Sequence, residues 1–150
     1  MLYYSKKSIL ERKNTTMISN NKIKKTVLLA FPNTSDIDYL TRLLSSNEYR
    51  IIGANNFLTL IEALDRFKVH LLISDVKLAD ISMAAFLPFL RKRFSDIKVI
   101  IAMKNYSPEL ELTLRQYNIL YVMRWPINGE LFMSVVEKGL KRFERGLVSI

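Results

Sequence analysis

From Lys25 onward, short apolar runs alternate with longer segments in which apolar residues recur at helical spacing. The apolar runs predict five β-strands, at residues 26–31, 49–54, 69–74, 97–103 and 120–124. Several of these runs are apolar at nearly every position, which is typical of parallel strands covered by helices on both faces.

Four amphipathic segments separate the predicted strands, and a fifth follows the last strand. The first helix is expected to begin at a cap formed by Ser35 or Asp36, and the fourth at residues 107–109, a serine followed by Pro and Glu. The third, about residues 82–94, contains Pro88, which should kink the helix or delay its start. The apolar positions expected to face the core are Ile37, Leu40, Leu43 and Leu44; Phe57, Leu60, Ile61, Leu64 and Phe67; Phe86, Leu87, Leu90 and Phe94; and Leu131, Phe132, Val135, Val136, Leu140 and Phe143.

Strands that alternate one for one with helices predict an α/β fold with an open, doubly wound parallel sheet. A chain of 150 residues is long enough for one domain with a substantial core, and the sequence has no internal repeat. We expect residues 23–150 to form this single domain.

The net charge of +9 is unevenly distributed along the chain. Residues 1–25 contain seven Lys or Arg residues and one Glu, a net +6, so that only +3 remains for the rest. We therefore expect residues 1–22 to be a basic, disordered leader, because they have too little apolar surface to fold. A solvated tail is the favoured interpretation, and contact with nucleic acid or anionic lipid is the alternative. Met17 is an alternative start to Met1.

Composition also limits the kinds of protein. The absence of cysteine excludes disulfides, thiol catalysis and thiolate metal sites. No apolar run is long enough to span a membrane or to form a signal peptide, so a cytoplasmic protein is expected. His70, near the start of the third strand, is interpreted as a strand residue rather than a catalyst. The basic clusters at residues 91–93 and 138–145 are interpreted as solvated helix faces, where cations suit the helix dipole.

Asp75 ends the apolar run of the third predicted strand. In doubly wound sheets, ligands bind beyond the carboxyl ends of the strands, at the point where the strand order reverses. Asp75 is therefore the first candidate site residue. The alternative is that its carboxylate only caps the turn into the next helix.

The stretch "LLISDVKLADISMAAFL" resembles the end of strand three in the receiver domains of bacterial two-component response regulators. Asp75 stands at the position of the phosphoacceptor, and Leu78 and Asp80 also match the family pattern. Ala79 and Met83 replace its usual Pro and Gly. The segment "VMRWPI" is similar to the end of the family's fifth strand, with Pro126 in register. The resemblance covers about residues 24–146 and implies a flavodoxin-like sheet of order 2-1-3-4-5 with five helices.

The resemblance also implies that the family's Mg²⁺ ligands are missing. The two acidic positions that end strand one align with Phe31 and Pro32, which have no side-chain oxygen. Asn33 follows and offers one amide oxygen, and Asp36 and Asp38 come later, on the first helix. Since Mg²⁺ requires several oxygen ligands, we expect the Mg²⁺ site to be lost and no cofactor to be bound.

Three further family positions are replaced. The Ser or Thr after strand four aligns with Met103, and the Lys that pairs with the acyl phosphate aligns with Trp125. Arg124 is next to Trp125, but strand alternation should direct it to the opposite face. The aromatic residue whose rotation follows phosphorylation in the family aligns with Val122.

These replacements predict a degenerate pocket around a vestigial phosphoacceptor, Asp75. Phe31, Pro32, Met103 and Trp125 should surround the carboxylate with apolar surface, which disfavours its ionised form. The family's matching Lys–Pro bond is commonly cis, so the resemblance implies a cis Trp125–Pro126 bond. We expect this bond to direct the indole into the crevice, over Phe31 and Met103.

The favoured hypothesis is a stand-alone, non-enzymatic receiver domain that acts in bacterial signal transduction by binding a protein, independently of phosphorylation. The resemblance places the partner surface on the fourth helix, the fifth strand and the fifth helix, about residues 107–145, where a homodimer could also form. The first alternative is a phosphorelay receiver that uses Asp75. The second is association with nucleic acid through the leader and the last helix, which should weaken steeply with added salt. A membrane role is not expected.

Overall fold

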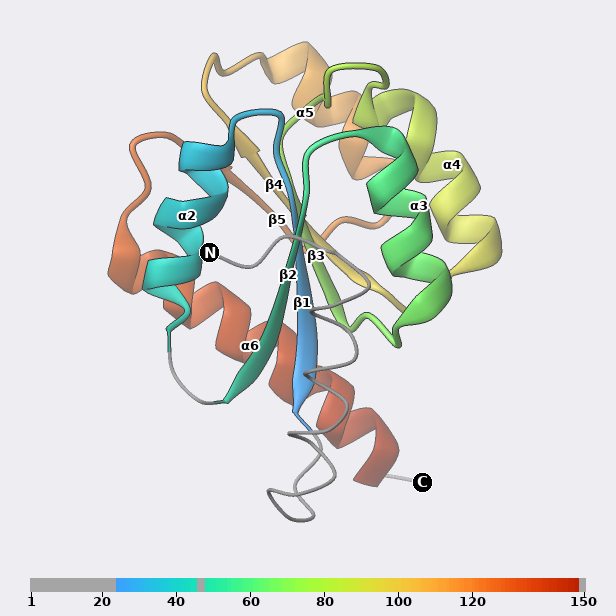
Figure 1. Cartoon of the computed structure of the whole chain (residues 1–150), viewed down its shortest axis with the longest axis vertical. Coiled ribbons are helices and arrows are strands. Elements are labelled where there is room, and N and C mark those ends of the chain that lie inside the picture. The colour runs from blue at the N-terminus through green and yellow to red at the C-terminus, as the bar shows by residue number, and fades with distance from the viewer. Residues whose placement is uncertain (1–23, 46–47, 149–150) are drawn as a thin grey trace.

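Five parallel strands form one sheet with helices on both faces (Figure 1). The computed structural model describes residues 24–45 and 48–148, and the side chains only as far as residue 141. The predicted leader, residues 1–22, lies outside this part of the chain. The order of elements is β1 (Lys25–Ala30), α2 (Thr34–Leu43), β2 (Tyr49–Ala54), α3 (Phe57–Arg66), β3 (Leu71–Ser74), α4 (Met83–Arg93), β4 (Lys98–Met103), α5 (Pro108–Arg115), β5 (Tyr121–Arg124) and α6 (Gly129–Val148).

The strand order is β2-β1-β3-β4-β5, so the predicted doubly wound sheet of order 2-1-3-4-5 is confirmed. The chain winds outward from β1 in one direction to β2 and in the other through β3 to β5. In the register of the sheet, Ala30 pairs with Ser74, and Ser74 with Ile101. The carboxyl ends of β1, β3 and β4 therefore meet at one edge, with the reversal of strand order between β1 and β3.

Two apolar clusters form the core, one on each face of the sheet. Strand residues alternate between them, so that Leu28 and Ala30 face one cluster while Leu29 and Phe31 face the other. Helices α3, α4 and α5 cover the face of Ala30, and α2 and α6 cover the face of Phe31 (Figure 1). The near-continuous apolar runs of the strands reflect this burial on both faces.

Side chains at the helix starts confirm some of the predicted caps and correct others. Ser107 caps α5 as predicted, because its hydroxyl oxygen accepts from the Leu110 N–H. Pro108 occupies the first helical position. The cap of α2 is Asn33, and not Ser35 or Asp36, because the Asn33 amide oxygen accepts from the Ser35 N–H at 3.0 Å. An amide oxygen two residues before Ser35 satisfies an N–H group of the first turn equally well, and pattern alone did not distinguish these possible starts.

The structure differs from the sequence predictions at two other helices. Pro88 does not delay α4, which begins at Met83 after the Ser82 cap and includes the proline. Leu131 does not face the core, since it is 42% exposed, whereas Phe132, Val135, Val136 and Leu140 of the same helix are buried. Leu131 lies in the first turn of α6, where an N-terminal apolar position need not face the sheet. The side chain of Phe143 is outside the described part of the chain.

Arg91 does not belong to a solvated face, which corrects the interpretation of residues 91–93. Its guanidinium donates to the Tyr117 and Ile97 carbonyls at 2.7 and 2.6 Å and to those of Ser95 and Asn118 at 3.3 and 3.2 Å. Burial lowers the pKa of this guanidinium. Arg91 therefore ties the end of α4 to the loops that lead into β4 and β5.

Candidate functional site

Asp75 lies where it was predicted, directly after β3 at the carboxyl edge of the sheet. Its N–H donates to the Ala30 carbonyl at 2.9 Å, which fixes it beside the end of β1. Its carboxylate accepts from the Val76 N–H at 2.6 Å and is half-buried. Burial is the main influence on the pKa of Asp75 and raises it, as predicted, while the hydrogen bond from Val76 acts in the opposite direction.

The residues after β1 provide little for a cation. Phe31 is fully buried in the cluster under α2 and α6, and Pro32 is exposed. Asn33 uses its amide oxygen as the α2 cap, where it accepts from both the N–H and the hydroxyl of Ser35 at 3.0 and 2.7 Å. Among the described residues, no three His, Asp or Glu side chains come together in a way that could hold a metal ion. The set does not fit the several oxygen ligands that Mg²⁺ requires.

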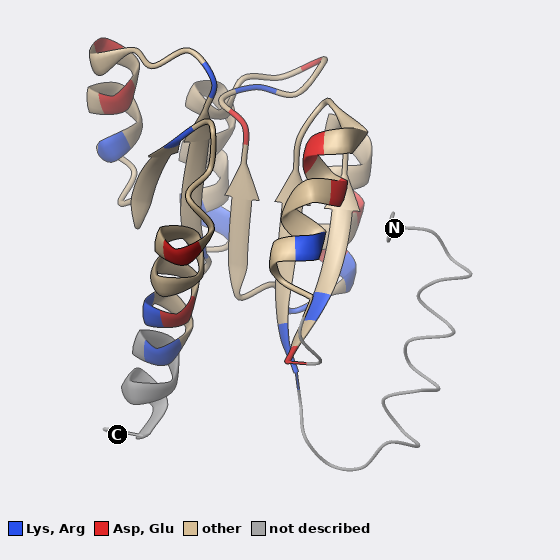
Figure 2. Ribbon diagram, turned by 90° about the vertical axis from the view of Figure 1, so that its left-hand side faces the viewer, with Lys and Arg blue, Asp and Glu red and all other residues tan. Residues whose placement is uncertain are grey.

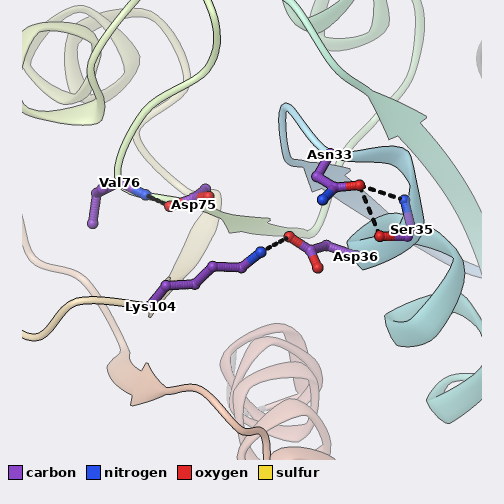
Figure 3. Close-up of polar contacts among 6 residues, drawn as sticks. All are labelled: Asn33, Ser35, Asp36, Asp75, Val76 and Lys104. Carbon is purple, nitrogen blue, oxygen red and sulfur yellow. Dashed lines mark hydrogen bonds and ion pairs between the residues drawn. The ribbon is translucent and has the colours of Figure 1, made fainter.

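A charged pair that the sequence analysis missed lies beside Asp75. Lys104 follows the end of β4, and its ammonium group is 2.7 Å from the carboxylate of Asp36, in the first turn of α2. Figure 3 shows the Lys104 side chain extending across the edge of the sheet to Asp36, with Asp75 on the adjacent loop. Both groups act on Asp75, since Lys104 lowers its pKa and Asp36 raises it. The surroundings of Asp75 are therefore less apolar than predicted.

Position in the sequence could have revealed this pair. Lys104 is the first residue after a predicted parallel strand, and Asp36 lies in the first turn of the helix that follows another. Because parallel strands end at the same edge, charged residues just beyond them are brought together. Lys104 stands at none of the family positions named above, so the resemblance did not point to it.

Trp125 occupies the crevice only in part as predicted. The Trp125–Pro126 bond is cis, as expected. The indole packs edge-on against Phe31, with ring centroids 6.4 Å apart, and tilted against Tyr39 at 5.9 Å. The Lys104 ammonium lies 5.4 Å from the centre of the indole ring. The indole N–H is buried and has no hydrogen-bond partner in the described part of the chain.

The predicted contact between Trp125 and Met103 is wrong. Met103 is fully buried in the cluster on the face of α3, α4 and α5, whereas Trp125 packs against the opposite cluster. The reason is strand alternation, which places the side chain of Met103, the last residue of β4, on the same face as Ala30 and away from Phe31. The backbones of the two residues do meet, since the Trp125 N–H donates to the Met103 carbonyl at 3.0 Å.

The loop after Asp75 is closely held. Met83 donates its N–H to the Val76 carbonyl at 2.9 Å, and Leu78 donates to the Ile81 carbonyl at 2.8 Å. The Asp80 carboxylate accepts from the Phe57 N–H at 3.0 Å, so it binds the first turn of α3 from outside that helix. Asp80, which the resemblance matched to a family position, therefore joins the loop of the candidate site to α3.

The other side of β5 carries an exposed polar network. The Arg124 guanidinium stacks 3.5 Å from the centre of the Tyr106 ring, which confirms that Arg124 and Trp125 point to opposite faces. Tyr106 donates its hydroxyl proton to Glu111, which also accepts from Arg115 at 2.6 Å. Leu112, on α5, is 71% exposed.

Comparisons with known structures identify the fold. A signal receiver domain from Vibrio parahaemolyticus is 26% identical, with a TM-score of 0.79 over 85% of this chain and 98% of that one. A CheY-like response regulator receiver domain protein from Methanospirillum hungatei is 19% identical, with a TM-score of 0.75 over 83% of this chain and 99% of that one. A response regulator from Thermotoga maritima is 18% identical, with a TM-score of 0.72 over 79% and 99%. No protein-family model matches the chain, and no curated protein matches it in sequence.

The chain therefore has the fold of receiver domains, and its structural neighbours are response regulator and signal receiver domains. None of the described helices combines the length and the apolar character that crossing a membrane would require.

Proposed function

We propose that this chain is an atypical response regulator receiver domain that binds a protein partner in signal transduction without being phosphorylated. The observation that carries the proposal is the replacement of cation ligands beside Asp75. Phe31 is buried with an apolar ring where the family has a carboxylate, and Asp36, a nearby carboxylate, is paired with Lys104. Phosphoryl transfer in the family uses a divalent cation that neutralises the charge on the transferring oxygens, and these residues do not offer the oxygen ligands that would hold one.

The groups that would hold a phosphoryl product are also replaced. Met103 offers no hydroxyl at the end of β4 and is buried on the opposite face of the sheet from Trp125. Trp125 stands where the family has its lysine, and its ring packs against Phe31 and Tyr39. These contacts support a site with one resting arrangement.

A direct test is exposure of the protein to acetyl phosphate and Mg²⁺, followed by intact-mass measurement. We expect no adduct on the wild-type chain. A stoichiometric adduct that disappears in Asp75→Asn would contradict the proposal. It would instead support the alternative, a phosphoacceptor receiver, which the half-exposed position of Asp75 at the strand end favours.

The proposed partner surface comprises α5, β5 and the start of α6, within residues 107–145. Strand β5 is an edge of the sheet, and Leu112 and Leu131 are exposed apolar side chains on the two flanking helices. The Tyr106–Arg124 stack adds an ordered aromatic and a guanidinium, which are enriched at protein interfaces. In Figure 2, α5 and the described part of α6 carry acidic and basic residues together. That mixture favours a protein over nucleic acid as the partner.

Two exposed leucines provide a matched pair of variants for testing this surface. Leu112 on α5 is 71% exposed and Leu58 on α3 is 65% exposed, so either can be replaced by Glu with little effect on the core. The wild-type chain should capture a partner protein from an extract of the native organism. Leu112→Glu should fail to capture that protein, and Leu58→Glu should still capture it. Equal capture by both variants would place the partner elsewhere.

A further inference from the structure

The loop between β4 and α5 joins the candidate site to the proposed partner surface. It consists of residues 104–107, the four positions between the last residue of β4 and the first of α5. Lys104, at its start, reaches Asp36 on α2, and the ring of Tyr106 stacks on Arg124 of β5. In so short a loop, the backbone position of the first residue limits where the third can lie.

The start of this loop is held by an ion pair with a buried partner. The Lys104 ammonium is 2.7 Å from Oδ2 of Asp36, whose side chain is only 11% exposed (Figure 3). Within the described residues, that oxygen is buried and has no hydrogen-bond partner, so the ammonium is the charge that compensates its burial. A carboxylate removed from water in this way is costly unless a cation is paired with it. The pair therefore fixes the start of the loop to α2.

The same end of the loop is also held through Trp125. The backbone N–H of Trp125 donates to the carbonyl of Met103, the residue before Lys104, at 3.0 Å. Its indole ring is centred 5.4 Å from the Lys104 ammonium, within the range of a cation–π interaction. Both the backbone and the side chain at the start of the loop are therefore fixed, by α2 and by the end of β5.

The contacts of Tyr106 are exposed, in contrast to those of Lys104. Its hydroxyl donates to Glu111 in the first turn of α5, and the Arg124 guanidinium lies 3.5 Å from the centre of its ring. Exposed polar contacts are individually weak because water competes for the same groups, whereas breaking a pair that contains a buried charge has a large effect. The pair at Lys104 should therefore decide where the Tyr106 ring lies.

We propose that Lys104 is a positioning residue for the partner surface: by pairing with Asp36, its ammonium fixes the β4–α5 loop in the arrangement that stacks Tyr106 on Arg124. Lys104 acts through the loop backbone and needs no contact with the partner. The stack then exists before binding, so affinity is not reduced by a fraction of molecules in which the surface is not formed. The inference deepens the proposed function and rests on the part of it that places the partner surface at α5 and β5.

The stack can be observed directly by NMR spectroscopy of the isolated protein. Protons of the Arg124 side chain that lie over the Tyr106 ring are displaced upfield by the ring current, and Tyr106→Leu, which has no ring, gives the reference position. We expect Lys104→Gln to lose at least half of the displacement that the wild type shows. The matched control is Lys77→Gln, at an exposed lysine after β3 that also acts on Asp75, and it should retain the displacement.

Two further variants separate the ion pair from the stability of the domain. Asp36→Ala removes the pair from its other side and should lose as much of the Arg124 displacement as Lys104→Gln does. Arg91→Met removes hydrogen bonds near the amino ends of β4 and β5, at the opposite edge of the sheet. It should lower Tm and still keep the displacement, with all spectra recorded at a temperature where every variant is folded.

Several results would overturn the inference. A wild-type Arg124 signal without displacement would show that the stack is not formed in solution. Full displacement in Lys104→Gln or in Asp36→Ala would show that the pair does not control the stack. Loss of the displacement in Lys77→Gln or Arg91→Met would assign the effect to charge or to stability in general.

The proposed function and this inference fail in different experiments. No partner is present in the NMR spectra, so they test the positioning of Tyr106 alone. Equal capture by Leu112→Glu and Leu58→Glu would contradict the proposed surface and leave the spectra unexplained by partner binding. An unchanged Lys104→Gln spectrum would contradict the role of Lys104 and leave the proposed surface in place.

Discussion

Replacing Arg91 should destabilise the domain more than any other change to an apparently exposed charge. The guanidinium reaches four backbone carbonyls, at Ser95, Ile97, Tyr117 and Asn118. These carbonyls belong to the loops before β4 and β5, so the side chain connects three segments. A methionine at position 91 would keep much of the apolar stem and remove all four donors.

The magnitude follows from the geometry of the four bonds. The two short ones, 2.7 Å to Tyr117 and 2.6 Å to Ile97, are partly buried and have a charged donor, so each contributes about 1–1.5 kcal/mol. The two longer ones, at 3.3 and 3.2 Å, are exposed and add a few tenths of a kcal/mol each. Arg91→Met should therefore lower the free energy of unfolding by about 2–4 kcal/mol.

Equilibrium urea unfolding measures this directly, with Lys92→Met as the control. Lys92 is the next residue of α4 and is exposed. The midpoint should fall by about 1–2 M for Arg91→Met, and the control should change the free energy by no more than about 0.5 kcal/mol. Arg91→Lys should recover less than half of the loss, because an ammonium lacks the planar fork that reaches several carbonyls. Equal midpoints for the Met variants at 91 and 92 would refute the argument.

Three other changes should give measurable effects. Burial and the neighbouring lysines lower the pKa of His70, whose Nδ1 accepts from the buried Thr26 N–H at 3.0 Å. The unfolded chain therefore binds the proton more readily than the folded chain, and the free energy of unfolding should fall as the pH drops below 6.5. Unfolding curves of His70→Ala should show a weaker dependence on pH. Burial raises the pKa of Asp75, so the ionised carboxylate lowers the stability of the folded chain at pH 7. Asp75→Asn should therefore unfold at an equal or higher temperature than the wild type at pH 7. Any gain in Tm should vanish below pH 3.8, where the carboxyl group is protonated in both the folded and the unfolded chain. Asp80→Ala should lower the free energy of unfolding by about 0.5–2 kcal/mol through loss of the bond to the Phe57 N–H, and Asp80→Asn, which keeps an acceptor oxygen, should lose less in the same urea assay.

The strands were predictable to within one or two residues because burial on both faces leaves a strong signal in the sequence. β2, for example, was expected at 49–54 and spans Tyr49–Ala54. Helix starts were less certain, because several polar residues in a row can each act as the cap, as Asn33 does in place of Ser35 or Asp36. Hydrophobic period also could not show that Leu131 is exposed, since the first turn of a helix can project beyond the sheet that the later turns cover.

The site was predictable only where it depended on strand ends. Asp75 and the crevice follow from topology, and the contact between Trp125 and Phe31 follows from their positions at two such ends. The positions of Lys104 and Asp36 after two parallel strands indicate that both lie at the same edge of the sheet, but their 2.7 Å contact depends on the direction of two side chains, which no local pattern encodes. Arg91 was wrongly interpreted as part of a solvated face for a similar reason. Its partners are backbone carbonyls, which every residue has, so they leave no pattern in the sequence.

The loop between β4 and α5 connects the interior of the site with the proposed partner surface. Lys104, at its start, is paired with Asp36 on α2, and Tyr106, two residues later, is bonded to Glu111 on α5 and stacked with Arg124 on β5. A loop held at both ends has little conformational freedom left to lose, so a partner that binds Tyr106 and Arg124 meets an ordered surface and pays a smaller entropic cost. The side chains of this loop already order it, so neither a metal ion nor a phosphoryl group is needed to do so. Because Lys104 brings its charge with the chain, the ordered arrangement is available without either of them, which is the property that a phosphorylation-independent binding domain requires.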